Sequence, residues 1–141
     1  MDRLEELRAE ETAKPLAFIM HDTATTRGDT AYSLVAAGGW AYYGLYVAVR
    51  DIVAGRPGHR YPIADGGKRL GWELHNLPEA DLEAFLGTLR AVGAVDREAW
   101  ERGELGLVEV DAAAEHRAAQ SAPKRLAAER TNAKRSAQRD A

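Results

Sequence analysis

Hydrophobic residues of this chain fall into short runs and helical stripes, and the densest apolar segment runs from Trp40 to Ala54. Large side chains lie on nearly every face of this segment, which predicts a helix buried on most sides at the centre of a small helical core. Gly38-Gly39 precede the segment and residues 55–58 (Gly-Arg-Pro-Gly) follow it, so helix-breaking residues mark both ends. Gly44 lies inside the helix, and because a mid-helix Gly costs about 1 kcal/mol relative to Ala, we expect a close helix crossing there.

Four other segments also have a helical pattern. Residues 2–13 are charged with few large apolar side chains, which predicts a loosely attached helix that ends before Pro15. Residues 29–37 suit a short helix that Asp29 caps and the glycine pair ends. Residues 65–75 predict another short helix. Residues 79–92 predict an amphipathic helix. Its apolar stripe consists of Leu82, Phe85, Leu86, Leu89 and Val92.

The extended segments are short. Residues 16–20 form an apolar strip, and residues 60–63 predict a short strand. Residues 105–110 predict a second strand, and a turn after Val95 would pair Ala94-Val95 with it as a hairpin. The expected fold class is therefore mainly α with a small β-hairpin.

This order of elements is that of a winged helix-turn-helix domain. Its helices would be 40–54, 65–75 and 79–92, and its wing 94–110. Order alone also fits other small α+β folds. We predict three regions: an N-terminal helical extension over 1–15, a winged-helix-like domain over 16–112, and a basic helical or disordered tail or linker over 113–141.

Scattered motifs in the first half of the domain resemble a known family. They are His21-Asp22, residues 26–29, Ala37-Gly38-Gly39 and Tyr43-Gly44-Leu45-Tyr46. This pattern resembles the N-terminal domain of phage replisome organisers and related DnaD-like replication initiators. One departure is that Asp22 is the only acid between Pro15 and Asp29, where the family has an acidic strip.

The second half of the domain adds to this resemblance. Residues 82–86, Leu89 and residues 92–95 resemble the family's helix and the start of its wing, although Ala94-Val95 stand where an aromatic residue is usual. The resemblance covers about residues 16–112. It implies a winged-helix module that takes part in starting replication or organising the replisome, without catalysis of its own.

Charge divides the chain into two unlike parts. After His116 there are seven basic residues against two acidic ones, a balance of +5, and because the whole chain carries −3, residues 1–115 carry −8. A basic, apolar-poor tail interrupted by Pro123 is typical of a segment that contacts a polyanion such as DNA. An ordinary solubilising tail or a linker explains the same composition.

The predicted third helix, which would enter the major groove in a helix-turn-helix reader, is itself acidic. Glu79, Asp81 and Glu83 are opposed only by Arg90, and this charge should repel phosphates. These three acids are therefore candidates for binding a protein partner.

The DNA-binding candidates lie in residues 55–72, where the balance is +3, and in the tail. A solvated helix start explains the first group equally well. The candidates are Arg56, Arg60, Lys68, Arg69, Arg117, Lys124, Arg125, Arg130, Lys134, Arg135 and Arg139.

Other functional classes find little support. The chain has no cysteine, its four histidines lack metal-ligand spacing, and neither glycine pair sits in a phosphate-binding motif. We therefore expect no enzyme activity, metal or cofactor. The aromatic group Trp40, Tyr42, Tyr43 and Tyr46 could stack bases, but its helical density favours the core. The apolar runs are too short for a membrane span and no signal peptide is present, which predicts a cytoplasmic protein.

Three functional hypotheses remain open. The first is a replication-initiation module that binds double- or single-stranded DNA non-specifically through the tail and recruits a replication protein, such as a helicase or its loader, through the acidic body. The second is a protein-interaction or homo-oligomerisation module without DNA affinity. The third is a winged-helix transcriptional regulator, which Arg90 alone supports only thinly.

Overall fold

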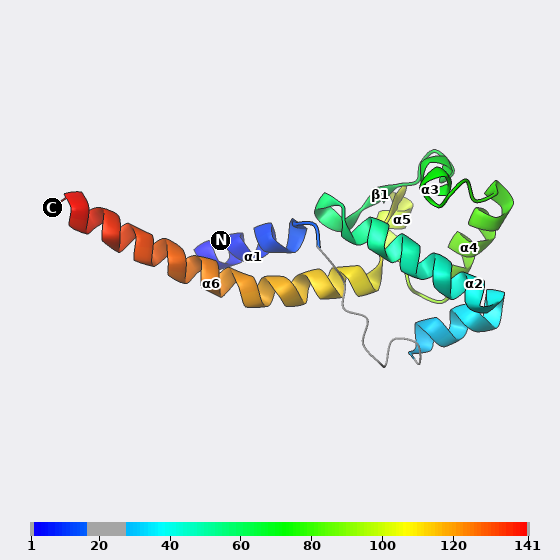
Figure 1. Ribbon diagram of the computed structural model, residues 1–141, viewed down its shortest axis with the longest axis horizontal. Coiled ribbons are helices and arrows are strands. Elements are labelled where there is room, and N and C mark those ends of the chain that lie inside the picture. Colours follow the sequence, from blue (N-terminus) through cyan, green and yellow to red (C-terminus); the bar gives the residue numbers. More distant parts are fainter. Residues whose placement is uncertain (1, 17–27, 141) are drawn as a thin grey trace.

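The computed structural model describes residues 2–16 and 28–140 of the 141-residue chain. A helical body stands at one end, and the last helix leaves it as a long projection (Figure 1). The elements are α1 (Arg3–Ala13), α2 (Asp29–Ala54), the 3-10 helix η2 (Pro57–His59), β1 (Tyr61–Pro62), α3 (Lys68–Glu73), α4 (Glu79–Ala91), α5 (Arg97–Glu101), β2 (Glu104–Leu105) and α6 (Val108–Asp140). The prediction of a mainly α fold with a small antiparallel sheet is confirmed. Most of the predicted strip at 16–20, with His21-Asp22, lies outside the described residues.

The glycine pair divides α2 into two helices that meet at a kink. Gly38 has φ −141° and ψ 15°, and Gly39 has φ 71° and ψ −169°, so the predicted helix end at this pair is confirmed. A Cβ on Gly38 would lie 2.3 Å from the ring of Tyr42. This contact is too close for any side chain, so position 38 requires glycine. Asp29 is the first helical residue rather than the predicted cap, and Gly28 is the N-cap.

Gly39→Ala is expected to lower the free energy of unfolding by about 1–3 kcal/mol, because its backbone lies in a region that only glycine adopts without strain. Gly44→Ala is the matched control. The predicted helix crossing at Gly44 is wrong: the position is exposed and a Cβ there would meet nothing within 4 Å. Alanine should therefore stabilise this helix by about 0.5–1 kcal/mol. Urea unfolding of both variants measures the two effects, and equal effects would contradict the account of the kink.

The core lies where α2, α3, α4 and the sheet meet. The predicted stripe of α4 is confirmed: Leu82, Phe85, Leu86 and Leu89 are buried, while Val92 is half-buried. Phe85 packs edge-to-face against Tyr42 of α2, with ring centroids 5.2 Å apart. This contact joins the predicted third helix to the central one.

The aromatic residues of α2 are not all in the core. Tyr46 is buried and Tyr42 and Tyr43 are half-buried, but Trp40 is 68% exposed, which contradicts its predicted core position. Trp40 directly follows the kink at Gly38 and Gly39. Its ring meets Tyr43 edge-on instead, with centroids 6.1 Å apart.

The sheet is built differently from the predicted hairpin. β1 pairs with β2 in antiparallel register, Tyr61 opposite Leu105, while Val95 forms an isolated antiparallel bridge with Leu107 on the other side of the same segment. Helix α5 fills the connection that the prediction gave to a turn. Val108 and Val110 belong to α6, not to a strand, so the predicted strand at 105–110 is too long at its end.

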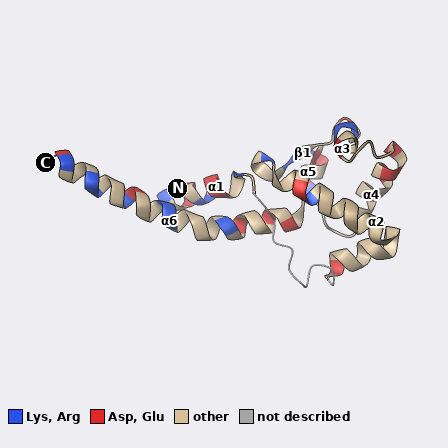
Figure 2. Cartoon of the chain, in the orientation of Figure 1, with Lys and Arg blue, Asp and Glu red and all other residues tan. Residues whose placement is uncertain are grey.

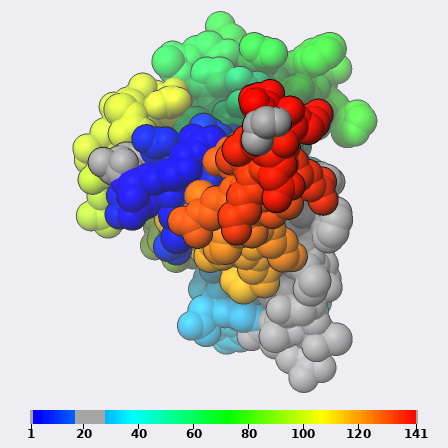
Figure 3. Space-filling model, turned by 90° about the vertical axis from the view of Figure 1, so that its left-hand side faces the viewer, coloured from blue at the N-terminus to red at the C-terminus, as the bar shows by residue number. Residues whose placement is uncertain are grey.

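Helices α1 and α6 run antiparallel and form the base of the projection (Figure 1), and Figure 3 shows the N-terminal segment lying against the C-terminal helix. A row of small side chains on α6, Ala114, Ala118 and Ala122, is buried, and Leu7 of α1 is fully buried. The predicted loose attachment of the N-terminal helix is therefore wrong. The small side chains let the two helices approach closely, so the pair needs few large apolar residues.

The predicted tail is not a separate segment. Helix α6 begins in the body at Val108 and runs without a break through Pro123, which was predicted to interrupt it. Proline removes one backbone hydrogen bond from a helix interior and costs about 3 kcal/mol or more. Contacts of α1 with Arg117 before the proline and with Arg125 and Glu129 after it hold both halves in line.

A charged cluster fixes the start of α6 to α2. Arg50 is 3% exposed, and its Nη1 lies 3.2 Å from Oε1 of Glu109. The hydroxyl of Tyr46 donates to the other oxygen of the same carboxylate. Burial of the phenol and the neighbouring Glu109 carboxylate raise the pKa of Tyr46 well above its usual range. The Glu109 carboxylate thus binds two buried side chains of α2, Arg50 and Tyr46.

Candidate nucleic-acid interface

The last eleven residues of α6, 130–140, form a free basic arm. Every one of them is exposed, and Glu129, just before them, pairs with Arg3 at the start of α1. At a rise of 1.5 Å per residue the arm extends about 16 Å past this point. Its charged residues are Arg130, Lys134, Arg135, Arg139 and Asp140, a balance of +3. The end of α6 is accordingly dominated by basic residues in Figure 2.

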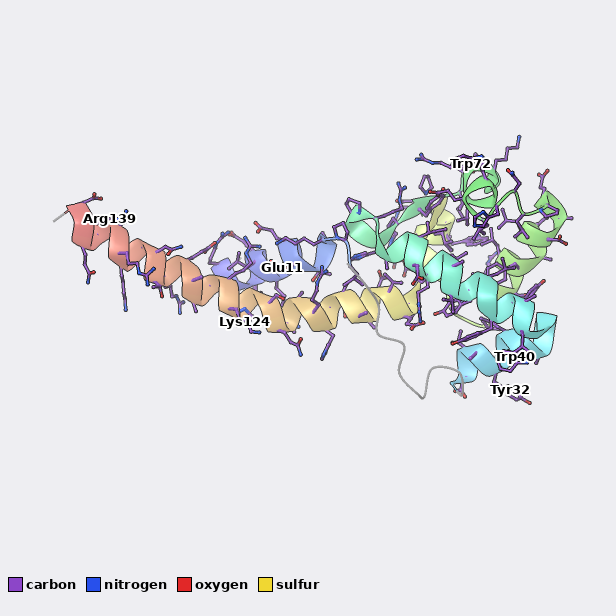
Figure 4. The ribbon with its side chains drawn as sticks, viewed as in Figure 1. Glu11, Tyr32, Trp40, Trp72, Lys124 and Arg139 are labelled. Carbon is purple, nitrogen blue, oxygen red and sulfur yellow. The ribbon has the colours of Figure 1, made fainter. Side chains whose placement is uncertain are left out.

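Within residues 2–16 and 28–140, none of the arm's four cations makes a hydrogen bond or an ion pair with another side chain. Arg130 and Lys134 lie one turn apart, as do Arg135 and Arg139, and at 3.6 residues per turn the two pairs face roughly opposite sides of the helix. Lys124, exposed on the same helix and equally free, lies outside the arm (Figure 4).

Two tail residues predicted to bind DNA instead hold α1. Arg117 donates to the main-chain oxygens of Glu11, Lys14 and Pro15 at 2.7–2.9 Å, which satisfies carbonyls left open where α1 ends. Arg125 lies 3.0 Å from carboxylate oxygens of both Glu10 and Glu11. Lys14 and, after it, Arg125 hold the pKa of Glu11 below its usual value. Both arginines therefore already have acceptors within the protein, unlike the cations of the arm.

Arg56 and Arg60 are engaged in the same way beside the sheet. Arg60 forms two hydrogen bonds with Asp111 of α6, at 2.8 and 3.2 Å, and these raise its pKa. Arg56 donates to the main-chain oxygen of Arg60 and lies over the ring of Tyr61 at 4.8 Å. The prediction placed both with Lys68 and Arg69 in one basic group. The structure separates them, because Asp111 of α6, which is distant in the sequence, lies against Arg60.

His59, next to Arg60, has a structural role. It is buried with a left-handed backbone (φ 54°), and its Nε2 donates to the main-chain oxygen of Lys14 at 2.8 Å. Burial lowers the pKa of this imidazole. The residues that the structure describes contain no group of His, Asp or Glu side chains arranged to hold a metal ion.

Helix α3 carries the remaining basic pair. Lys68 and Arg69 are exposed, and neither side chain has a hydrogen-bond or ion-pair partner among the described residues. Beside them Trp72 is 70% exposed. Sequence reasoning missed this residue, because the pattern of residues 65–75 does not show which side of the helix packs on the body. The four-residue spacing from Lys68 was the available signal.

The predicted acidic surface of α4 is also exposed. Glu79, Asp81 and Glu83 lie on its solvent side, and no ion pair involves them in the described part of the chain. Arg90, in the last turn, lies over the ring of Trp100 at 5.6 Å. The exposed face of α4 therefore presents negative charge over its first two turns and only one cation beyond them.

No protein family, curated protein or solved structure matches this chain. None of the described helices is long and apolar enough to cross a membrane. The arm, the acidic face of α4 and the α3 corner are accordingly interpreted from their own chemistry.

Proposed function

We propose that this protein is a non-catalytic DNA-binding module of replication initiation or replisome organisation. It contacts duplex DNA through the arm and recruits a replication protein, such as a helicase or its loader, through the acidic face of α4. The observation that carries the proposal is the exposed helix 130–140, whose four cations have no partner in the described chain.

The topology of the body supports a winged-helix domain. The second half of α2, then β1, α3, α4 and β2 follow the winged-helix order. The segment around β2 lies between β1 and Val95, as the third strand of such a domain lies between the first and second. Helix α5 takes the place of the wing's tip. This order agrees with the resemblance to DnaD-like initiators in residues 16–112.

The arm suits duplex DNA because it is a helix with cations on two opposite sides. The major groove is about 12 Å wide and admits an α-helix, with a phosphate backbone along each edge. A helix lying there would direct Arg130 and Lys134 to one strand and Arg135 and Arg139 to the other. These contacts read charge rather than sequence, so the binding is non-specific.

The charge of α4 favours a protein partner over DNA. Glu79, Asp81 and Glu83 on the helix that would read bases in a sequence-specific regulator should repel phosphates. Carboxylates in the first turn also stabilise the helix through its dipole by about 0.3–1 kcal/mol. A basic surface on a replication protein would satisfy these acids without loss of helix stability.

Neutralising the arm tests the proposal. The arm-neutral variant replaces Arg130, Lys134, Arg135 and Arg139 by Gln, which keeps helix propensity close to that of the original residues. Fluorescence anisotropy with a labelled duplex at low salt should show that this variant binds at least tenfold more weakly than the unaltered protein.

The matched control carries the same loss of four positive charges away from the arm, by changing Arg8, Arg90, Arg97 and Arg102 to Gln. These residues are exposed, so the variant should stay folded. We expect it to keep its duplex affinity within about threefold. Equal losses in both variants would mean that net charge, and not the arm, attracts DNA.

A further inference from the structure

Trp72 is placed where a tryptophan gains little from folding. Large aromatic side chains contribute most when their area is removed from water, yet 70% of Trp72 is exposed on the outer side of α3 (Figure 4). Its neighbours Leu70 and Leu74 are buried and hold α3 to the body. The indole is thus a rigidly mounted aromatic surface that the core does not use.

Two cations that have no side-chain partner among the described residues flank this indole. Lys68 precedes Trp72 by four residues and Arg69 by three, so both lie on the same helix face as the ring. Asp65, just before α3, uses its two oxygens to accept from the backbone N–H groups of Gly67 and Arg69 at 2.9 and 3.1 Å. Glu73 accepts from the hydroxyl of Tyr61. Each carboxylate is held by a partner other than these cations.

A small hollow lies against the ring. It has a volume of about 210 Å³ and is lined by Lys68, Gly71, Trp72, Asn76 and Glu79, among others. Pockets for drug-sized ligands are about 300–1,000 Å³, so this hollow suits one flat group rather than a whole ligand. Gly71 lines the hollow at the point where α3 crosses α4. A Cβ on Gly71 would lie 3.3 Å from Leu82 of α4.

We propose that this corner of α3 binds single-stranded DNA by stacking an unpaired base on Trp72. Lys68 and Arg69 contact the flanking phosphates, and the side-chain amide of Asn76, which lines the hollow, meets the edge of the base. Duplex DNA does not enter, because its bases are already stacked within the helix. The inference rests on the proposed DNA binding and adds a strand preference to it.

The stacking site is separate from the arm. Trp72 lies on the body and Arg139 at the far end of α6 (Figure 4). One molecule therefore carries a duplex contact at one end and a contact for unpaired bases at the other, an arrangement suited to a junction between duplex and opened DNA.

The test uses the full-length arm-neutral variant, so that the arm contributes nothing. Its affinity for a labelled oligothymidine of about twelve nucleotides is measured by anisotropy, with and without Trp72→Ala. Base–aromatic stacking is worth about 1–3 kcal/mol per base, so the substitution should weaken binding roughly 5- to 150-fold. Trp72→Phe should lose less, since it keeps a ring.

Trp40→Ala is the matched control, because Trp40 is equally exposed (68%) but lies on α2 away from Lys68 and Arg69. It should leave oligothymidine affinity unchanged. Unchanged affinity in Trp72→Ala, or an equal loss in Trp40→Ala, would overturn the stacking site. Duplex binding by the unaltered arm reports separately on the proposed function, since Trp72→Ala in the otherwise unaltered protein should leave it intact.

Discussion

Glu109→Ala is expected to lower the free energy of unfolding by about 3–5 kcal/mol. Glu109 is 36% exposed, but Arg50 is buried, and removing the partner of a buried charge leaves that charge uncompensated, which is costly in a medium of low dielectric constant. Arg50 would be that charge, since it is 3% exposed and its Nε already lacks a hydrogen-bond partner among the described residues. The hydroxyl of Tyr46 would lose its acceptor as well.

The remaining acid near Arg50 cannot replace Glu109. Asp51 lies 3.8 Å from Nε of Arg50, but its side chain is mostly exposed. Chemical denaturation of Glu109→Ala and of the double variant Arg50→Met/Glu109→Ala measures the effect. The double variant should regain much of the lost stability, because the buried charge is gone. If the double variant is as unstable as Glu109→Ala, the unpaired charge of Arg50 is not the cause of the lost stability.

Phe85→Ala should cost about 3–5 kcal/mol, the usual range for removing a buried aromatic ring. Phe85 is fully buried in α4, and its ring packs against Tyr42 of α2. The loss combines lost transfer free energy with a cavity between the two helices. Thermal or urea unfolding measures it.

Phe85→Leu provides the graded control, because it keeps an apolar side chain of similar volume and should cost less than about 1.5 kcal/mol. An alanine variant as stable as the leucine variant would mean that α4 repacks onto α2 without the ring. The position of α4 in the body would then depend on its other buried leucines.

The sequence predicted the helices well because their signals are local. The stripe of α4, the glycine pair in α2 and the charged N-terminal helix each depend on residues within a few turns. The helix order followed from these, and the fold class with it. Pro123 is the exception, because its effect on α6 is offset by α1, which lies more than a hundred residues away in the chain.

The wing was predicted less well because its partners are distant. Val108 and Val110 have a strand-like pattern, yet they start α6, where Val110 is buried and Glu109 meets Arg50 from α2. The strand-like pattern therefore comes from a buried Val110 and from a Glu109 that pairs with Arg50, and not from one face of a strand. Nothing in residues 105–110 alone distinguishes this helix start from a strand.

The candidate DNA-binding residues were predicted from their charge. Charge alone could not separate the cations that pair with acids from those that face solvent. Arg60 and Arg125 resemble Lys68 and Arg135 in sequence, but the first two face acids on other elements and the last two face solvent. Sorting the eleven candidates required knowing which acid each one meets. Trp72 was missed because its exposure depends on how α3 packs on the body.

The salt dependence of duplex binding tests the arm most directly. For duplex DNA, log K falls with log salt concentration by about 0.9 per phosphate neutralised. If each arm cation contacts one phosphate, the unaltered protein should lose affinity with a slope steeper than that of the arm-neutral variant by about 3.6. Identical slopes for the two proteins would contradict the assignment of DNA binding to residues 130–140.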